Sequence, residues 1–179
     1  MDFALARYNP DGSLDTGFGN NGKVTTKIFD GNDYAEAVAI QRDGRIVVAG
    51  RAAPSSGTMD FAICRYDPDG TLDPSFGNSG KVVIDASFPA GLSDAAPGLA
   101  IQPDGKILVT GRNGADRFGL VRLHNDGSLD TGFGASGKVS TDFEPAFDSP
   151  EAIATTAGRC SRDCAPSHSA ARPGIKVES

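Results

Sequence analysis

Closely spaced aspartates around a glycine are the feature of this sequence that most resembles a chemical site. From Asp67 to Asp73 the chain reads Asp-Pro-Asp-Gly-Thr-Leu-Asp. Calcium-binding loops place carboxylates at alternating positions around such a glycine turn. Two sister segments have Asn9 and His124 in place of Asp67, and the glutamate that closes an EF-hand loop is missing. We therefore interpret the segments as tight turns in which a recurrent aspartate accepts hydrogen bonds from nearby backbone amides. These aspartates are Asp15, Asp73 and Asp130.

An arginine and a phenylalanine also recur once in each of the three segments. The arginines stand in apolar surroundings and are Arg7, Arg65 and Arg122. Because a buried guanidinium needs an anionic partner, the recurrent aspartates are the candidates, and we interpret the pairs as structural. A catalytic pair is not usually needed three times in one chain. For the same reason we expect the phenylalanines to fill gaps between repeats rather than bind a ligand. They are Phe18, Phe76 and Phe133.

Few other residues are candidates for metal or nucleophile chemistry. Cys160, Cys164 and His168 have a loosely metal-like spacing, but three ligands are too few and Pro166 interrupts any helix. The sequence contains no nucleophile elbow, phosphate-binding glycine loop or zinc signature. It therefore predicts no catalytic, cofactor-binding or metal-binding residue and no cofactor.

The third cysteine, Cys64, stands where the sister segments have Ala6 and Val121. This position predicts a small buried hydrophobic side chain. No disulfide framework is implied. His124 occupies a turn position.

All of these residues lie in a repeat that organises most of the chain. Residues 60–82 recur as residues 2–24 and 117–139, so that Gly12, Gly70 and Gly127 are 58 and 57 residues apart. A second unit at residues 39–50 recurs at residues 100–111. A fixed period of this size indicates a repeat architecture.

One complete repeat predicts a four-stranded antiparallel meander, with strands at residues 37–41, 45–50, 60–66 and 81–85. Asp43 and Gly44 supply the positive backbone torsion of a tight turn between the first two strands. The second and third strands are apolar at nearly every position, which is typical of burial on both faces. The fourth carries charges and hydroxyls, which suits an outer edge where lysine discourages further strand pairing. The predicted fold is all-β, a partial β-propeller of four-stranded blades.

The predicted blades do not close a ring. A half blade is expected at residues 2–29, blades at 35–86 and 97–143, and the start of a further blade at 151–154, or about 2.5–3 blades where closed propellers use about four to eight. Either the chain is a fragment of a longer protein or two chains complete one ring. We favour the fragment because both ends interrupt a repeat. Residues 155–179 lack the pattern and are predicted to be disordered.

The acidic composition narrows the classes of partner. The net charge is −6 and the isoelectric point about 4.8, which argues against binding to nucleic acid phosphates. No apolar run reaches the length of a membrane span, and no signal-peptide pattern is present. These features leave the compartment open.

The recurring pattern Asp-Phe-Ala-x-x-Arg-Tyr-x-x-Asp-Gly-x-Leu-Asp-x-x-Phe-Gly-x-x-Gly-Lys-Val resembles the delta-60 repeat family. The hairpin Gln-x-Asp-Gly-Lys-Ile-x-Val between its copies is also similar to NHL-type propeller repeats. The resemblance covers residues 2 to about 154. It implies β-propeller-like bacterial repeats, often in long exported or surface proteins without an assigned activity.

Two classes of function remain open. The first is an interaction module that binds a protein or glycan through loops that differ between copies, at residues 29–33, 52–59, 86–96, 113–117 and 143–150. In a meander these loops share one end of the blades, where Asp30, Asp33 and Asp94 would make the surface acidic. The second is a propeller hydrolase or lyase with acid–base residues facing the central channel, with or without calcium. We favour the interaction module because no catalytic constellation is present.

Overall fold

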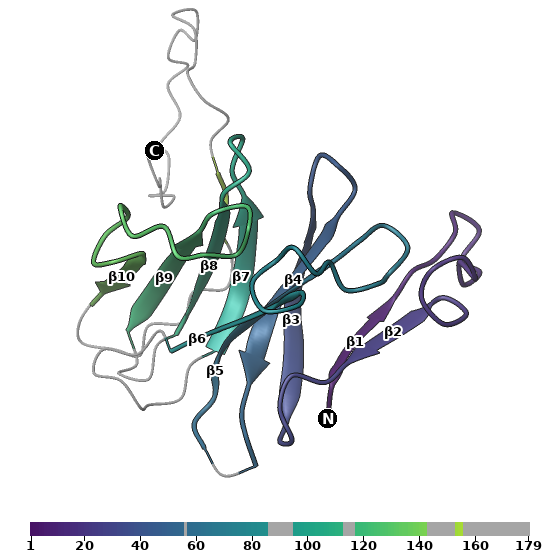
Figure 1. The fold of residues 1–179 in the computed structure, drawn as a ribbon, viewed down its shortest axis with the longest axis horizontal. Coiled ribbons are helices and arrows are strands. Elements are labelled where there is room, and N and C mark those ends of the chain that lie inside the picture. The colour runs from purple at the N-terminus through teal and green to yellow at the C-terminus, as the bar shows by residue number, and fades with distance from the viewer. Residues whose placement is uncertain (56, 86–94, 113–116, 143–152, 156–179) are drawn as a thin grey trace, which may run out of the picture.

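The structure is a computed structural model that describes residues 1–55, 57–85, 95–112, 117–142 and 153–155 (Figure 1). Within these ranges all regular secondary structure is β-strand. The strands are β1 (Phe3–Ala6), β2 (Lys23–Thr26), β3 (Asp33–Ile40), β4 (Ile46–Ala52), β5 (Asp60–Tyr66), β6 (Lys81–Ile84), β7 (Ala95–Ile101), β8 (Ile107–Arg112), β9 (Phe118–Leu123) and β10 (Lys138–Thr141).

The strands form three antiparallel sheets that stand side by side (Figure 1). We call the β1–β2 pair the first blade, the β3–β4–β5–β6 meander the middle blade and the β7–β8–β9–β10 meander the last blade. The prediction of an all-β, open and partial β-propeller with four-stranded antiparallel blades is therefore confirmed. The first blade has only two strands, which correspond to β5 and β6 of the middle blade.

The predicted tight turns explain where the inner hairpins reverse. Gly44 and Gly105 have backbone φ angles of 86° and 87°, which a residue with a side chain rarely adopts. In the middle blade the Gln41 amide donates to the Arg45 carbonyl across the turn, at 2.8 Å. The same bond forms between Gln102 and Lys106. Local sequence alone therefore specifies these turns.

β3 is longer than predicted, since it begins at Asp33 and not at residue 37. The alternation of side chains between the two faces of the sheet is interrupted, because the pairing of β3 with β4 shifts register between Ala35 and Ala37. Gly50 makes this irregularity possible, because a Cβ atom there would lie 1.9 Å from the Tyr34 carbonyl oxygen. A bulge of this kind breaks the alternation of residues between the two faces of the sheet, so strict alternation does not predict the whole strand.

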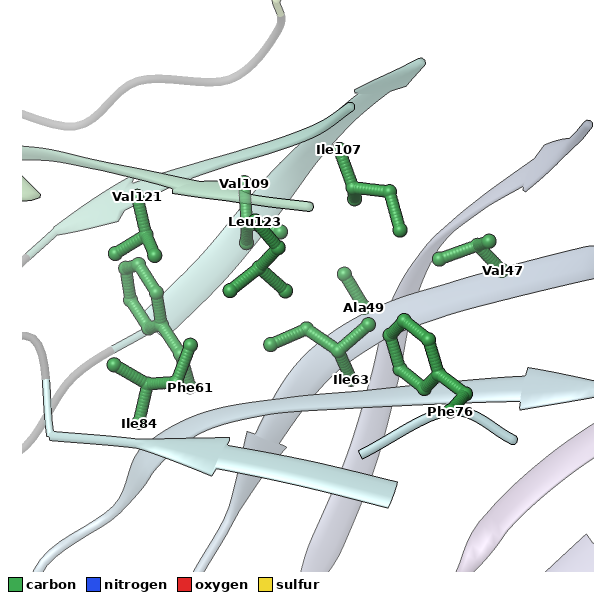
Figure 2. Packing of buried hydrophobic residues seen from close by; sticks show 10 residues of the cluster. All are labelled: Val47, Ala49, Phe61, Ile63, Phe76, Ile84, Ile107, Val109, Val121 and Leu123. Carbon is green, nitrogen blue, oxygen red and sulfur yellow. The ribbon is translucent and has the colours of Figure 1, made fainter. Parts of the chain in front are cut away.

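The core consists of side chains packed between consecutive blades. On β4, Val47 and Ala49 face the last blade, whereas Ile46 and Val48 face the first blade. Figure 2 shows side chains of β8 and β9 meeting those of β4 and β5 in the space between the middle and last blades. The prediction that the second and third strands of a repeat are buried on both faces is confirmed in the middle blade, where β4 and β5 lie between the first and last blades.

The outer strands β2, β6 and β10 are partly exposed, as predicted. Their lysines have a further role that the sequence did not reveal. The Lys81 ammonium donates to the Lys27 carbonyl of the first blade at 2.7 Å, and the Lys138 ammonium donates to the Asp85 carbonyl of the middle blade. Each of these lysines therefore bridges to the preceding blade.

The expected start of a further blade lies only partly within the described residues. Residues 151–152 and 156–179 fall outside them, and Ile153 and Ala154 are not in a strand. Ile153 packs against a small cluster of the last blade formed by Leu108, Phe118 and Leu120. In the part of the chain that the structure covers, no helix is long and apolar enough to cross a membrane.

Candidate functional site

The recurring arginines and aspartates form ion pairs in all three blades, as predicted. The arginine Nε donates to an aspartate Oδ2 at 2.8 Å in the pairs Arg7–Asp15, Arg65–Asp73 and Arg122–Asp130. Burial of the pair differs between copies. The Arg65 and Asp73 side chains are 3% and 4% exposed, whereas those of Arg7 and Asp15 are 37% and 31% exposed.

Each of these arginines also lies over the recurring phenylalanine. The guanidinium carbon is 4.6 Å from the Phe18 ring centre in the first blade, 4.6 Å from Phe76 in the middle blade and 4.2 Å from Phe133 in the last blade. Sequence reasoning missed this cation–π contact. The signal that could have revealed it is the constant spacing of eleven residues between the arginine and the phenylalanine in every copy.

This cluster joins one blade to the next. The Gly19 amide donates to the Asp69 carbonyl at 2.7 Å, and the Gly77 amide donates to the Asp126 carbonyl at 2.8 Å. The Arg65 guanidinium also donates to the Asn125 carbonyl of the last blade. We call the Arg, Asp, Phe and Gly of one blade, with the Asp-Gly turn of the next, the blade joint. Its polar groups bind one another, so the joint is structural.

Phe18 and Phe76 are fully buried against the following blade, which confirms their predicted place between repeats. Phe133 occupies the same position in the last blade but is only partly buried. The difference follows from the missing neighbour, because no Asp-Gly turn packs on Phe133 within the described residues.

We expect alanine at Gly127 to destabilise the protein more than alanine at Gly12. Both glycines have φ near +85° to +89°, so each substitution carries a left-handed backbone penalty of about 1–2 kcal/mol. A Cβ at Gly127 would also lie 2.9 Å from the Gly77 amide nitrogen, whereas nothing lies within 4 Å of one at Gly12. Urea denaturation should show Gly127→Ala to be about 1–3 kcal/mol worse than Gly12→Ala. Equal losses of stability in the two variants would contradict the close packing of Gly127 against Gly77 in the blade joint.

The aspartate loops fold as the predicted turns. Asp73 Oδ1 accepts hydrogen bonds from the Ser75 amide at 2.9 Å and the Ser75 hydroxyl at 2.6 Å. Asp15 and Asp130 accept from the amides of Gly17 and Gly132 in the same way. The carboxylates therefore bind donors of the protein itself. The described residues contain no group of three or more side chains that could hold a metal ion.

The pKa of Asp73 is below its usual value of 3.8. Burial alone would raise this pKa, but the hydrogen bonds from Ser75 and the charge of Arg65 outweigh it. A carboxyl whose pKa is lower in the folded state contributes stability that is complete above its unfolded pKa, near 3.9, and is lost as the pH falls further.

We therefore expect the free energy of unfolding to decrease below about pH 4, with a smaller decrease in Asp73→Asn because that variant lacks the titrating carboxyl. Urea denaturation at pH 5, 4, 3 and 2.5 would measure both slopes. Parallel slopes for the variant and the natural sequence would show that Asp73 does not carry the effect.

Two of the other sequence candidates, Cys64 on the middle blade and His124 on the last blade, are among the described residues. Cys64 is fully buried, as predicted, and burial raises the pKa of its thiol to about 12. His124 lies 3.7 Å from Asp130, at its turn position. Cys160, Cys164 and His168 lie outside the described residues.

The inner strands offer little acid–base chemistry where the structure describes them. Glu36 on β3 pairs with Arg51, with Nε and Oε1 3.3 Å apart. Asp33 is buried, and its Oδ2 accepts from the amides of Ile28 and Phe29 at 2.7 and 3.2 Å. The described side chains of β7, from Gly98 onward, are apolar.

Two of the variable loops lie against one another at one end of the blades. A Cβ at Gly31, in the loop before β3, would be 2.3 Å from the Ala53 carbonyl in the loop after β4. The Ala53 amide donates to the Asn32 carbonyl at 3.2 Å. These described loops share one surface, as the meander predicted. Residues 86–94, 113–116 and 143–150 are outside the described part.

The predicted acidity of this end needs a correction. Asp30 is exposed and pairs with Lys27 at 2.6 Å, but Asp33 is fully buried. Asp33 therefore shapes the loop before β3 and adds no charge to its surface. Asp94 is not among the described residues.

A separate apolar groove lies beside the first blade. It has a volume of about 390 Å³ and lies between β1 and the inner strands β3 and β4, with Phe18 as part of its wall. On its floor, Val38 and Ile40 are 65% and 71% exposed.

Parts of all three repeats match the model of a known protein family. A family model described as a domain of unknown function (DUF5122) beta-propeller matches residues 2–18, 41–76 and 102–133. This match supports a β-propeller repeat family. Each matched segment ends at the phenylalanine of a blade joint and contains the arginine and aspartate of that joint. No curated protein matches the chain.

Proposed function

We propose that this β-propeller repeat scaffold is a non-enzymatic interaction module that binds a protein or glycan through its variable loops. The observation that carries this proposal is the use of the recurring Arg–Asp pairs in the blade joints. Those groups hold the blades in place, so chemistry specific to this chain must lie where the repeats differ. The described parts of the differing loops, in residues 29–33 and 52–59, lie at the end of the blades opposite the Asp-Gly turns.

The described loops have features of a binding surface on a rigid support. Lys27 and Asp30 project from the loop before β3, with exposed side chains, while the buried Asp33 fixes the backbone beneath them. Ser55 is exposed in the neighbouring loop. Exposed polar groups on a fixed backbone suit recognition of a polar surface such as a glycan.

The resemblance of the repeats to the delta-60 family supports a wider context for this module. In that context the chain is part of a larger bacterial exported or surface protein. Its propeller blades would display the variable loops to the outside, with no activity of their own.

A glycan array and a panel of purified surface proteins would test this function. The natural sequence, a loop variant and a turn variant would be compared. The loop variant is Lys27→Ala/Asp30→Ala/Ser55→Ala, and the turn variant Arg42→Ala changes an exposed residue at the opposite end. We expect a ligand that the loop variant loses and the turn variant keeps. Failure of the natural sequence to bind any probe, or loss only in Arg42→Ala, would refute the proposal.

A further inference from the structure

Three side chains at the base of the described variable loops form a cluster of their own. Tyr34 on β3 lies directly opposite Arg51 on β4, one pair in from the end of the strand ladder where the loops of residues 29–33 and 52–59 begin. The guanidinium carbon of Arg51 lies 5.0 Å from the centre of the Tyr34 ring. Its Nε lies 3.3 Å from Glu36 Oε1. We call Tyr34, Glu36 and Arg51 the loop-base cluster.

The β-bulge of β3 brings the glutamate to this cluster. The pairing of β3 with β4 passes from Ala35 to Ala37, so Glu36 is the extra residue of the bulge. A bulge changes the direction in which such a side chain points, and Glu36 reaches Arg51 from this position. An aromatic ring, a carboxylate and a guanidinium are thus held together on paired strands, which position a binding site more precisely than loops do.

The fold does not require these residue types. The last blade has a bulge at the same place in β7. There the repeat positions of Tyr34 and Glu36 hold Ala95 and Pro97, and only the arginine recurs, as Arg112. The two four-stranded blades therefore share the backbone arrangement but not the tyrosine and the carboxylate. Such a difference is expected of residues that bind a ligand rather than of those that support the fold.

The cluster has capacity for further hydrogen bonds. The side chains of Arg51 and Glu36 are 35% and 23% exposed, and Tyr34 is also partly exposed. Although Glu36 is close, the Arg51 Nε makes no hydrogen bond within the described residues. The guanidinium is thus aligned with the tyrosine ring rather than with the carboxylate. A guanidinium has several N–H donors and a carboxylate has two acceptor oxygens, so both groups can bind a ligand from this position.

This combination of groups suits an uncharged carbohydrate. A hydroxyl both donates and accepts hydrogen bonds, so neighbouring sugar hydroxyls can accept from the Arg51 guanidinium and donate to the Glu36 carboxylate. The apolar body of a tyrosine packs against the C–H face of a sugar ring. A ligand with an anionic group would be repelled by Glu36 and by the chain's net charge of −6, and a cationic ligand would be repelled by Arg51.

We propose that the loop-base cluster is a subsite for a neutral glycan. Tyr34 packs against one sugar ring, Arg51 donates hydrogen bonds to its hydroxyls and Glu36 accepts hydrogen bonds from them. This inference rests on the proposed function, and it narrows the ligand from a protein or glycan to an uncharged carbohydrate.

An array of neutral, uronate-containing and sulfated oligosaccharides is the probe for this inference. We expect the natural chain to bind neutral oligosaccharides, and Tyr34→Ala or Arg51→Met to bind them at least about tenfold more weakly. Glu36→Gln keeps the shape of the side chain but removes its charge. It should weaken neutral binding and admit uronate-containing oligosaccharides that the natural chain rejects. A glutamate with only a structural role would not produce this gain.

Arg112→Met is the matched control, because Arg112 occupies the repeat position of Arg51 without the tyrosine and the glutamate. It should bind neutral oligosaccharides as tightly as the natural chain, and a loss equal to that of Arg51→Met would overturn the role of the cluster. Circular dichroism would establish that each variant is folded. Glu36→Gln is an isosteric change at a partly exposed residue, so it keeps the test decisive if Tyr34→Ala does not fold.

Three further results would overturn the inference. The first is neutral glycan binding that the variant Lys27→Ala/Asp30→Ala/Ser55→Ala loses but the cluster variants keep. The second is binding of the natural chain to charged glycans alone or to proteins alone. Both of these results leave the proposed function standing. The third is binding to no probe, which refutes the proposed function and the inference together.

Discussion

Replacement of Arg65 by alanine is expected to destabilise the protein by up to about 3–5 kcal/mol, because it leaves the buried Asp73 carboxylate with only the more exposed Arg45 as a cationic partner, at 3.1 Å. Arg65 and Asp73 are almost completely buried, and the guanidinium also contacts Phe76 and the last blade. A loss of this size is a large fraction of the stability of an ordinary domain, which is about 5–15 kcal/mol. The midpoint of urea denaturation would report it.

The repeat supplies a matched control at Arg7. Arg7 makes the same ion pair with Asp15 and the same contact with Phe18, but its side chain is more than a third exposed. Arg7→Ala should therefore cost no more than about 1 kcal/mol. The double variant Arg65→Met/Asp73→Leu removes both charges and should recover most of the loss. Similar costs at Arg7 and Arg65 would mean that burial of the joint does not set its energy.

Truncation of Phe76 should have a comparable effect, with a loss of about 3–5 kcal/mol in Phe76→Ala. Phe76 is fully buried between the middle and last blades, beside Val47 and Ile63 (Figure 2). Removal of its ring leaves a cavity at the contact of two sheets and removes the partner of the Arg65 guanidinium. Thermal or urea denaturation would measure the loss.

Phe133→Ala is the corresponding control in the last blade. Its ring contacts Arg122 as closely as Phe76 contacts Arg65, but it is only partly buried. The expected loss is roughly 1–2 kcal/mol, since less apolar area leaves water when the protein folds. If Phe133→Ala proved as costly as Phe76→Ala, the phenylalanine would stabilise its own blade rather than the contact with the next.

Within each repeat, the sequence by itself determined the order of the strands, the turns and the ion-pair partners, although not the start of β3. The Asp-Gly pairs of the repeat turns have a positive torsion at the glycine, as at Gly44, and largely apolar runs such as residues 60–66 mark strands buried on both faces. The pairing of Arg65 with Asp73 followed from the repetition of both residues in an apolar setting. These features are local or periodic, so they could be read without coordinates.

Only the tertiary structure decided which equivalent residues are buried and which are open. Tyr8 and Tyr66 occupy the same position of the repeat, yet Tyr8 is exposed and Tyr66 is buried against Thr26. Val38 and Leu99 differ in the same way. Burial depends on which blade stands alongside, and a neighbouring blade is distant in sequence. The acidic surface assigned to Asp33 was wrong for this reason, because the contacts that bury its carboxylate form only in the folded protein.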